Sequence, residues 1–401
     1  MEGNRFPLDW HRAACAGQCM KPPSYRHSLL ILVLGLTPVR HARAEDAVTY
    51  KYQDYHEADG RIAVQVHSAL IEKELGPAMQ LKVSGVIDAI AGATPTGQPP
   101  ATPDGQVPLS QLEEERKAWA LELSRQFSRY KITVGAANSR ESDYVSNGWS
   151  LNGQADFNAR NTTVLLGVAG MDDDVKVFFQ PTPMAKHTVD MIAGVTQLLD
   201  PVTSVTFNLT YSQSTGYLSD PYKLVQKRVE VLPGIFLLRT YGENRPDSRR
   251  KWIALAALNR AWPKLAGAVE ASYRFHRDDH GLSSHTLNLE WYQKLGARFM
   301  VRPALRYFTQ QAADYYFVSL TGTPIAPTSR PTGAAPYYSA DYRLSALRSL
   351  NYGLKVIWTV TDAWQVDAAV ERYEMHGRDG LTAASAYPRA NIVTAGIKFA
   401  F

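Results

Sequence analysis

The segment 276–280 carries side chains that could bind a metal ion. His276, Asp278 and His280 lie within five residues of one another, and His285 follows shortly after. Imidazole and carboxylate groups suit a borderline cation such as Zn²⁺. The spacing matches no compact zinc motif, and charged residues in a loop are commonly only solvated. We therefore predict no metal site and no cofactor, and we keep His276, Asp278 and His280 as the weak candidates.

Ser284 and His285 raise a second kind of chemistry, serine-based hydrolysis with the histidine as general base. Neighbouring residues on a strand point to opposite faces, so these two side chains could not form a hydrogen-bonded pair there without distortion. No G-x-S-x-G, Walker A, G-x-G-x-x-G or H-E-x-x-H motif is present. We predict that the chain is not an enzyme and has no catalytic residues.

A larger set of charged residues occurs at alternate positions, on the polar side of segments that read as strands. Three of them, Arg298, Arg302 and Arg306, form a row that predicts a mild preference for anions in a wet pathway. The alternative is that opposite charges on neighbouring strands simply stabilise the wall. The set comprises Lys82, Asp88, Glu122, Glu270, Arg274, Glu290, Arg298, Arg302, Arg306, Lys355, Asp367, Glu371 and Lys398.

These residues would be positioned by β-strands, because alternation of apolar and polar residues dominates the chain from residue 48 to its end. In 203–212, for example, Val205, Phe207 and Leu209 fall on one face while polar residues fall on the other. The same pattern recurs in 61–70, 265–276, 286–292, 297–309 and 393–401. A soluble β-sandwich also alternates, so the pattern alone does not identify the fold.

The connections between these segments differ in length and supply the sharper evidence. Short joints are expected at 75–78, 128–129, 159–161, 200–202, 262–264, 295–296 and 361–363. The opposite connections are mostly longer, at 58–60, 92–114, 141–149, 171–186, 213–249, 277–282, 310–340 and 376–390. Seven short joints and eight opposite loops make sixteen strands. An even number of strands with both termini on the short-turn side is typical of an outer-membrane barrel.

Composition agrees with a barrel that crosses a membrane. No stretch reaches the roughly 18 to 20 apolar residues that a spanning helix needs, whereas roughly 9 to 11 residues suffice for a tilted strand. The 8 Trp, 21 Tyr and 13 Phe include many at strand ends, as an interfacial girdle requires. We predict an all-β fold, an antiparallel transmembrane β-barrel of about 16 strands, with 14 as the alternative, short periplasmic turns and longer extracellular loops.

The first 44 residues read as an N-terminal extension and a secretory signal peptide. Basic residues after Met20 precede the apolar run 29–36, and Ala42-Arg43-Ala44 has the small residues of a cleavage site. We expect cleavage near Ala44, a single barrel domain over 45–401, and Met20 as a candidate true start. The mature chain then lies in the outer membrane of a Gram-negative bacterium.

Removing residues 1–44 changes the charge and the cysteine content. Six of the 43 basic and two of the 38 acidic residues precede residue 45, which leaves 37 against 36. No clustered basic excess remains, so binding to nucleic acid is not expected. Both cysteines, Cys15 and Cys19, also lie in the removed part, and a cysteine-free chain suits passage through an oxidising compartment.

Several short motifs, taken in order, resemble a bacterial family known as domain of unknown function 3570. They include Glu141-Ser142-Asp143-Tyr144, Gly216-Tyr217-Leu218-Ser219-Asp220-Pro221-Tyr222, Glu243-Asn244-Arg245-Pro246-Asp247 and Arg306-Tyr307-Phe308-Thr309-Gln310. The resemblance covers most of the mature chain. It implies an outer-membrane β-barrel and no catalytic residues, since the family has no established activity.

Barrel width leads to the expected function. Barrels of about 16 to 18 strands leave an aqueous lumen unless loops fill it, which predicts a passive, porin-like channel for small polar solutes. The alternative is a non-conducting barrel that serves as a scaffold or as the outer-membrane part of an envelope redox or assembly system, with a periplasmic partner. The expected partners are outer-membrane lipid and, through the terminal Phe401, the barrel assembly machinery. The sequence leaves the oligomeric state open.

Overall fold

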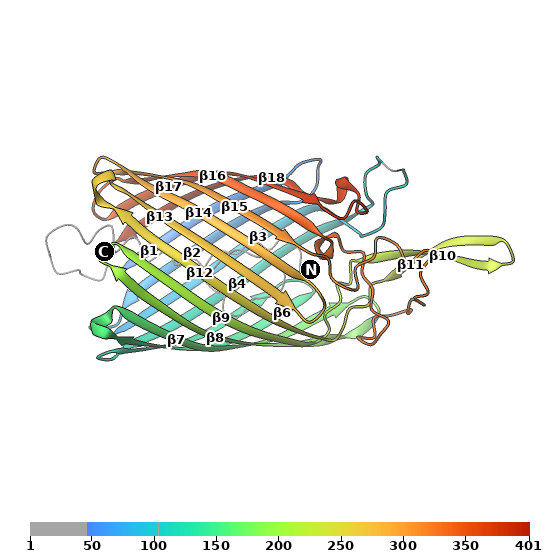
Figure 1. The fold of residues 1–401 in the computed structure, drawn as a ribbon, viewed down its shortest axis with the longest axis horizontal. Helices are drawn as coiled ribbons and strands as arrows, with labels where there is room; N and C mark the ends of the chain where they lie inside the picture. Colours follow the sequence, from blue (N-terminus) through green and yellow to red (C-terminus); the bar gives the residue numbers. More distant parts are fainter. Residues whose placement is uncertain (1–45, 103) are drawn as a thin grey trace.

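Sixteen strands form one closed antiparallel barrel in the computed structural model, which describes residues 46–102 and 104–401 (Figure 1). Neighbours in the barrel are neighbours in sequence, except that β9 pairs with β12 and β1 pairs with β18. The β1–β18 register runs from Ala47 opposite Ala400 to Glu57 opposite Ala390 and closes the sheet. The predicted all-β barrel of 16 strands is confirmed. The predicted leader, with Cys15, Cys19, Met20 and Ala44, lies outside the described residues.

The barrel strands are long, as tilted membrane-crossing strands must be. Their bounds are β1 Ala47–Glu57, β2 Ala63–Glu74, β3 Met79–Pro95, β4 Leu109–Gln126, β5 Tyr130–Arg140, β6 Tyr144–Phe157, β7 Thr162–Val177, β8 Gln180–Asp200, β9 Thr203–Gly216, β12 Ser248–Trp262, β13 Gly267–Asp278, β14 Ser283–Leu295, β15 Phe299–Gln310, β16 Leu347–Thr359, β17 Trp364–Gly377 and β18 Arg389–Ala400. A separate hairpin consists of β10 Leu224–Leu232 and β11 Ile235–Gly242. Four short 3₁₀ segments, η1 Asn158–Arg160, η2 Pro263–Leu265, η3 Tyr342–Leu344 and η4 Ala384–Ala386, lie in connections.

The seven short joints predicted from sequence lie between strands, within one or two residues of their expected positions. They all lie at the end of the barrel that carries the C-terminus (Figure 1). Two of them contain the short helices η1 and η2. This is the short-turn, periplasmic end of the barrel.

The opposite connections differ from the prediction where strands continue beyond the apolar band. β7 and β8 extend to Val177 and from Gln180, so the loop expected at 171–186 is reduced to a two-residue turn. The loops expected at 92–114 and 141–149 are likewise shortened to 96–108 and 141–143. The extended parts carry charged outward residues, such as Asp172 and Asp174 on β7, because they lie beyond the lipid. Apolar alternation therefore underestimates strand length at this end.

The two faces of the wall have opposite character. Large apolar side chains such as Trp119, Leu121 and Leu209 are exposed on the outer face, while Asp88, Arg274 and Arg302 are buried on the inner face. Exposed apolar bands and closed backbone pairing are what a strand protein needs to cross lipid. The chain is an outer-membrane β-barrel. Separately, no helix within residues 46–102 and 104–401 is long and apolar enough to span a membrane.

Aromatic side chains gather at the periplasmic edge of the outer face. Trp262 lies 5.5 Å from Trp291, and Trp364 lies 4.5 Å from Phe399, measured between ring centroids. Phe399 in turn stacks on Phe401 at 5.7 Å. These rings form an interfacial girdle of the kind found in outer-membrane barrels.

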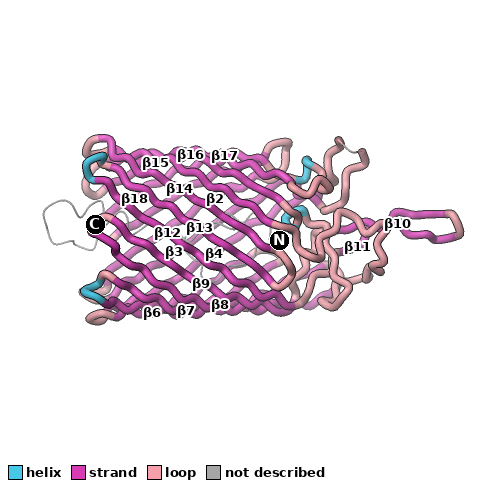
Figure 2. The backbone as a smooth tube through the Cα atoms, viewed as in Figure 1, coloured by secondary structure: helices cyan, strands magenta, loops and turns pink. Residues whose placement is uncertain are grey.

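The long connections gather at the other, extracellular end, where the β10–β11 hairpin projects away from the barrel (Figure 2). The hairpin exposes apolar side chains around its tip, including Leu232, Phe236 and Leu238. Its base is held by the connection between β15 and β16. There the amide of Leu320 donates to the carbonyl of Gln226 at 2.8 Å.

Candidate functional site

Most of the charged residues predicted to line a pathway lie on the inner face of the wall. Each side chain points to the same face of its strand as the buried polar residues do. Its neighbours along the strand are outward apolar residues, as Ile87 is beside Asp88. The inward-facing members of the predicted set are Lys82, Asp88, Glu122, Glu270, Arg274, Glu290, Arg302, Arg306, Lys355, Asp367, Glu371 and Lys398. Whether they select solutes remains a prediction.

Arg298 departs from this arrangement. It lies in the turn 296–298, before β15 begins at Phe299, and its side chain is exposed. Its backbone carbonyl accepts a hydrogen bond from the amide of Thr359 at 2.8 Å. Of the predicted row, Arg302 and Arg306 lie within β15, and Arg298 immediately precedes it. Two arginines of the row remain on the wall.

Arg302 belongs to a cluster that spans β13, β14 and β15. Its Nη1 lies 3.0 Å from Oε2 of Glu290. The hydroxyl of Tyr292 donates to Oε2 of Glu290 at 2.9 Å and to Oε2 of Glu270 at 3.3 Å. Glu270 and Glu290 are direct cross-strand partners. The cluster thus holds two carboxylates beside one guanidinium, which reduces the positive field expected from the arginine row.

Opposite charges also pair elsewhere on the inner wall. Lys355 Nζ lies 2.5 Å from Oδ1 of Asp367 across β16 and β17. On β2 and β3, Lys82 Nζ lies 2.8 Å from Oε1 of Glu72, and Lys82 is also the register partner of Glu122 on β4. These pairs match the cross-strand ladder considered as the alternative to a selectivity feature.

The sequence reading missed several inward charges. Arg116 Nε donates to Oδ2 of Asp88 at 2.8 Å, and Lys186 Nζ lies 3.3 Å from Oδ2 of Asp173. Asp173 and Lys186 fell in a stretch predicted to be a loop. Arg116 continues the inward alternation of Glu122 on β4, a signal that was available in the sequence.

The extracellular mouth is spanned by a folded assembly that we call the cap, made of residues 217–223, 243–247 and 311–346. Lys223 Nζ donates to the carbonyl oxygen of Pro95 at 2.5 Å, although β9 and β3 are six positions apart around the barrel. The hydroxyl of Tyr222 donates to Oδ2 of Asp143 at 2.6 Å, in another loop of the mouth. Contacts between such distant strands require the cap to cross the opening.

A buried ion cluster lies inside the cap. Glu243, Arg245 and Asp341 expose only 1%, 2% and 0% of their surface. Arg245 Nε lies 2.6 Å from Oε1 of Glu243, and Arg245 Nη2 lies 2.8 Å from Oδ2 of Asp341. Arg343 joins Asp341 to Asp220, its Nη2 lying 2.7 Å from Oδ2 of Asp220. Losing one partner would leave a buried charge uncompensated, which is strongly destabilising.

Burial sets the protonation of this cluster. The pKa of Glu243 is raised to about 7, because burial disfavours its charged form more strongly than the neighbouring Arg245 favours it. The pKa of Asp341 is lowered to about 2, because Arg343, Lys223 and Arg245 together outweigh the effect of burial. The two carboxyls of one cluster therefore respond to pH in opposite directions.

Apolar packing supports the ionic contacts of the cap. Val225, Leu320, Tyr338 and Ala340 form one buried cluster. The side-chain amide of Asn244 donates to the carbonyl oxygens of Ala334 and Pro336 at 2.7 and 2.9 Å. These bonds join segment 243–247 of the cap to segment 311–346. The cap is therefore a small folded unit rather than a set of separate loops.

The weak metal candidates have other roles. Asp278 accepts from Arg249 Nε at 2.7 Å and from the backbone amides of His280 and Leu282 at 3.0 and 2.9 Å. His280 Nε2 lies 2.8 Å from the carbonyl oxygen of Ser248, and His276 is buried on the inner face of β13. Across residues 46–102 and 104–401, no three His, Cys, Asp or Glu side chains are placed to hold a metal ion.

Ser284 and His285 point to opposite faces of β14, as strand geometry predicts. Ser284 is buried on the inner face, whereas His285 is exposed and its Nδ1 lies 2.7 Å from the hydroxyl of Tyr273. The two side chains do not form a nucleophile and base pair.

Three of the solved structures that resemble this chain share low sequence identity with it. A point mutant of the ferric enterobactin receptor of Pseudomonas aeruginosa is 13% identical with a TM-score of 0.43, over 88% of this chain and 59% of that one. The siderophore receptor PirA of Pseudomonas aeruginosa is 11% identical with a TM-score of 0.44, over 88% and 61%. A loop-deletion mutant of OmpT, an outer membrane protein of Vibrio cholerae, is 6% identical with a TM-score of 0.42, over 89% and 99%.

This chain thus spans about three fifths of the length of the two siderophore receptors. A comparison with curated proteins found no match. A family model described as "Protein of unknown function (DUF3570)" matches residues 33–186 and 179–401, and the chain belongs to this family.

Proposed function

We propose that the protein is a channel for small polar solutes across the outer membrane, closed at its extracellular mouth by the cap. The observation that carries the proposal is the inner wall, where charged side chains from most strands line a 16-stranded barrel. Barrels of about 16 to 18 strands have room for an aqueous lumen. The paired charges on the wall suit a pathway for small polar solutes of either sign.

The cap supplies the gate in this proposal. Its ion cluster joins loops that emerge from distant parts of the rim, so breaking the cluster releases them from one another. Arg245 and Arg343 each contact Asp341, and Arg343 also contacts Asp220. Replacing both arginines removes the guanidinium partners of Asp220 and Asp341, which favours an unpacked cap.

The test is single-channel recording of the refolded mature chain in a planar bilayer, after heat-modifiable migration verifies the folded barrel. We expect brief or infrequent openings for the natural chain. The double variant Arg245→Ala, Arg343→Ala should open more often and to a larger conductance. A matched control is Arg250→Ala, Arg277→Ala, which removes two exposed arginines of β12 and β13 from the outer rim.

Silence from both the natural chain and the cap variant, with the barrel demonstrably folded, would contradict the channel proposal. Equal conductance of the cap variant and the rim control would show that the cap does not gate the channel. The two results separate the pathway from its gate.

The second candidate function is a non-conducting scaffold or an outer-membrane part of an envelope redox or assembly system. The tightly packed cap, with its buried ion cluster, favours this reading over an open pore. Site-specific photo-cross-linking from the exposed Lys264, in the periplasmic turn that contains η2, would test it. Capture of one defined periplasmic protein, together with electrical silence, would favour this candidate.

We also infer export with cleavage after Ala44. The mature protein would then begin at Glu45. N-terminal sequencing of the protein extracted from outer membranes checks this. A start at any residue well before Glu45 would overturn it.

A further inference from the structure

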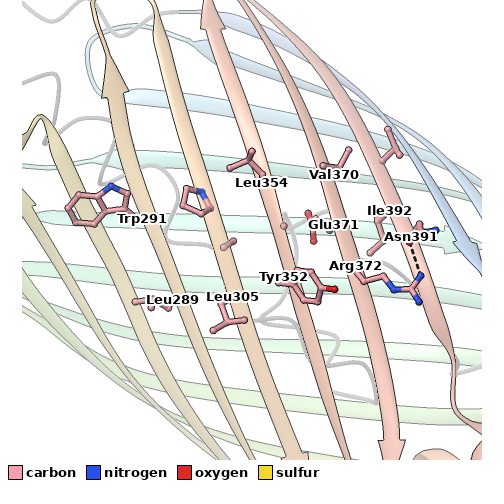
Figure 3. A pocket seen from close by; sticks show the side chains of 14 residues that line it. Leu289, Trp291, Leu305, Tyr352, Leu354, Val370, Glu371, Arg372, Asn391 and Ile392 are labelled. Atoms are coloured by element: carbon pink, nitrogen blue, oxygen red, sulfur yellow. Dashed lines mark hydrogen bonds between the residues drawn. The ribbon is translucent and has the colours of Figure 1, made fainter.

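The outer face of β14 to β18 carries a hollow of about 830 Å³ (Figure 3). Its lining is mostly apolar and faces lipid, with Leu289, Trp291, Leu305, Leu354 and Val393 among its side chains. We call it the outer groove. A long acyl chain matches such a surface, because lipid tails pack against apolar side chains without a polar partner.

Residues of β15 and β16 form the floor of the hollow. Ala304 on β15 lies opposite Gly353 on β16, and both share the inward alternation of Arg302 and Lys355, so neither adds a side chain to the outer face. On the outer face the compact ring of Pro303 lies opposite Leu354, and Leu289 and Leu354 rise beside it. The groove is therefore part of the wall itself and does not depend on a loop.

Cations lie at the extracellular end of the groove. Arg372 is part of the lining, and its Nη1 donates to Oδ1 of Asn391 at 2.8 Å (Figure 3). Arg348 on β16 and Arg389 on β18 are exposed on the same outer face. Among the described residues, neither guanidinium group has a hydrogen-bond or ion-pair partner, so both are available to a ligand.

The opposite side of the rim has a different charge. The outward extracellular parts of β4 and β7 carry four carboxylates and two lysines, namely Glu113, Glu115, Asp172, Asp174, Lys117 and Lys176. The outer face around the outer groove carries Arg348, Arg372 and Arg389 against two outward carboxylates, Glu374 and Asp54. Glu374 lies 3.2 Å from Arg372 Nε and is the register partner of Arg389, and Asp54 is the register partner of Val393. Excess positive charge therefore coincides with the apolar hollow on one side of the barrel.

We propose that the outer groove binds one phosphorylated lipid of the outer leaflet, with acyl chains in the hollow and phosphate at Arg348, Arg372 and Arg389. Guanidinium groups bind phosphate through paired, charge-assisted hydrogen bonds. Basic residues at the end of an apolar membrane surface are a recurring arrangement for anionic lipid head groups. A phosphorylated lipid is the ligand that satisfies both parts of this surface.

The experiment is native mass spectrometry of the full mature barrel in detergent, titrated with diphosphoryl lipid A. Phosphatidylcholine serves as the lipid without net charge, and inorganic phosphate as the head-group chemistry without acyl chains. We expect lipid A to be retained by the natural chain. The double variant Arg348→Ala, Arg389→Ala should bind it roughly 25-fold more weakly, since each cation near a membrane surface contributes about fivefold.

The matched control is Lys117→Ala, Arg140→Ala, which removes two outward cations from the far wall, where Lys117 and Arg140 are register partners. This control should bind lipid A as the natural chain does. Val393→Trp fills the groove while keeping its arginines, and it should also weaken lipid A binding. All variants are exposed substitutions, and heat-modifiable migration verifies folding.

Three results would overturn the proposal. The first is equal affinity of the arginine variant and the far-wall control for lipid A. The second is retention of phosphatidylcholine as tightly as lipid A, which would make the groove a general site for acyl chains. The third is inorganic phosphate binding that competes fully with lipid A, which would assign the arginines to a free anion. None of these readouts depends on channel activity.

Discussion

The pairing of Arg302 with Glu290 decides how much of the arginine charge reaches the lumen. If solutes pass this wall, Glu290→Gln should shift the reversal potential under a salt gradient towards anions, because Arg302 then loses its carboxylate partner. Arg302→Gln should shift it by a similar amount towards cations. Arg298→Gln, in the exposed periplasmic turn, is the control and should leave the potential nearly unchanged. Shifts of the same sign for both wall variants would rule out a direct electrostatic effect.

Glycine at position 267 allows an aromatic ring of the girdle to lie flat on the wall. A Cβ added to Gly267 would lie 2.4 Å from Cζ2 of Trp291, so Gly267→Ala must displace that ring. We expect a loss of about 1 to 3 kcal/mol in the free energy of unfolding, measured with urea in detergent or lipid. Gly85→Ala is the control, because a Cβ there meets no atom within 4 Å. Equal effects of the two substitutions would contradict this packing argument.

The cap is the element whose stability should depend on pH. Because folding raises the pKa of Glu243 to about 7, the stability that this carboxyl contributes is complete below about pH 4.5 and is lost as the pH rises through about 7. Asp341 acts in the opposite sense, with a pKa lowered to about 2, and loses its contribution only as the pH falls through about 2. Between pH 5 and pH 8 the cap should therefore loosen as the pH rises.

Single-channel recording at pH 5 and pH 8 checks this expectation, with more frequent openings at pH 8. The charged, titratable and hydroxyl groups that act on Glu243 are Asp220, Lys223, Arg245, Asp341, Tyr217, Tyr315 and Ser339. Glu243→Gln should abolish the pH dependence, whereas Asp247→Asn, at an exposed carboxyl nearby, should retain it. A pH dependence that survives Glu243→Gln would assign the effect to another group.

At the scale of the whole molecule, closure depends on the two ends of the chain. β18 is paired with β17 on one side and with β1 on the other, so the last strand completes the barrel. Phe401 follows it, stacked on Phe399 and lying 5.3 Å below Lys73 Nζ, measured to the ring centroid. We expect deletion of Phe401 to lower the amount of heat-modifiable barrel in cells, if assembly machinery reads this residue.

The same deletion should refold in detergent almost as well as the natural chain, because the strand register ends at Ala400. Phe157→Ala, at an exposed girdle position of the same barrel end, is the control for loss of an aromatic ring. Equal loss of assembled barrel in cells for the two variants would argue against a terminal signal.

Much of the barrel could be predicted from the sequence because strand alternation is a local property. Each lipid-facing side chain, such as Leu209, must be apolar whatever the rest of the chain does, and the next residue along the strand points to the other face. The seven periplasmic turns were located for the same reason, since apolar alternation ends on both sides of each. Apolar alternation mispredicts the strands where this constraint is absent. β7 and β8 continue above the lipid with charged residues, and Arg298 precedes its strand by one residue.

By itself, then, the sequence determined the strand count, the barrel class and the inward alternation of the wall charges. Only the tertiary structure decided which charges meet. Arg343 and Asp220 are 123 residues apart, and they pair because the circumference of the barrel brings two loops together across the mouth. The outer groove depends likewise on the sheet, since its lining comes from five neighbouring strands, β14 to β18. Alternation depends only on residues that are neighbours in sequence. Contacts between loops and across strands join residues that are far apart in sequence, and they form because the sheet closes.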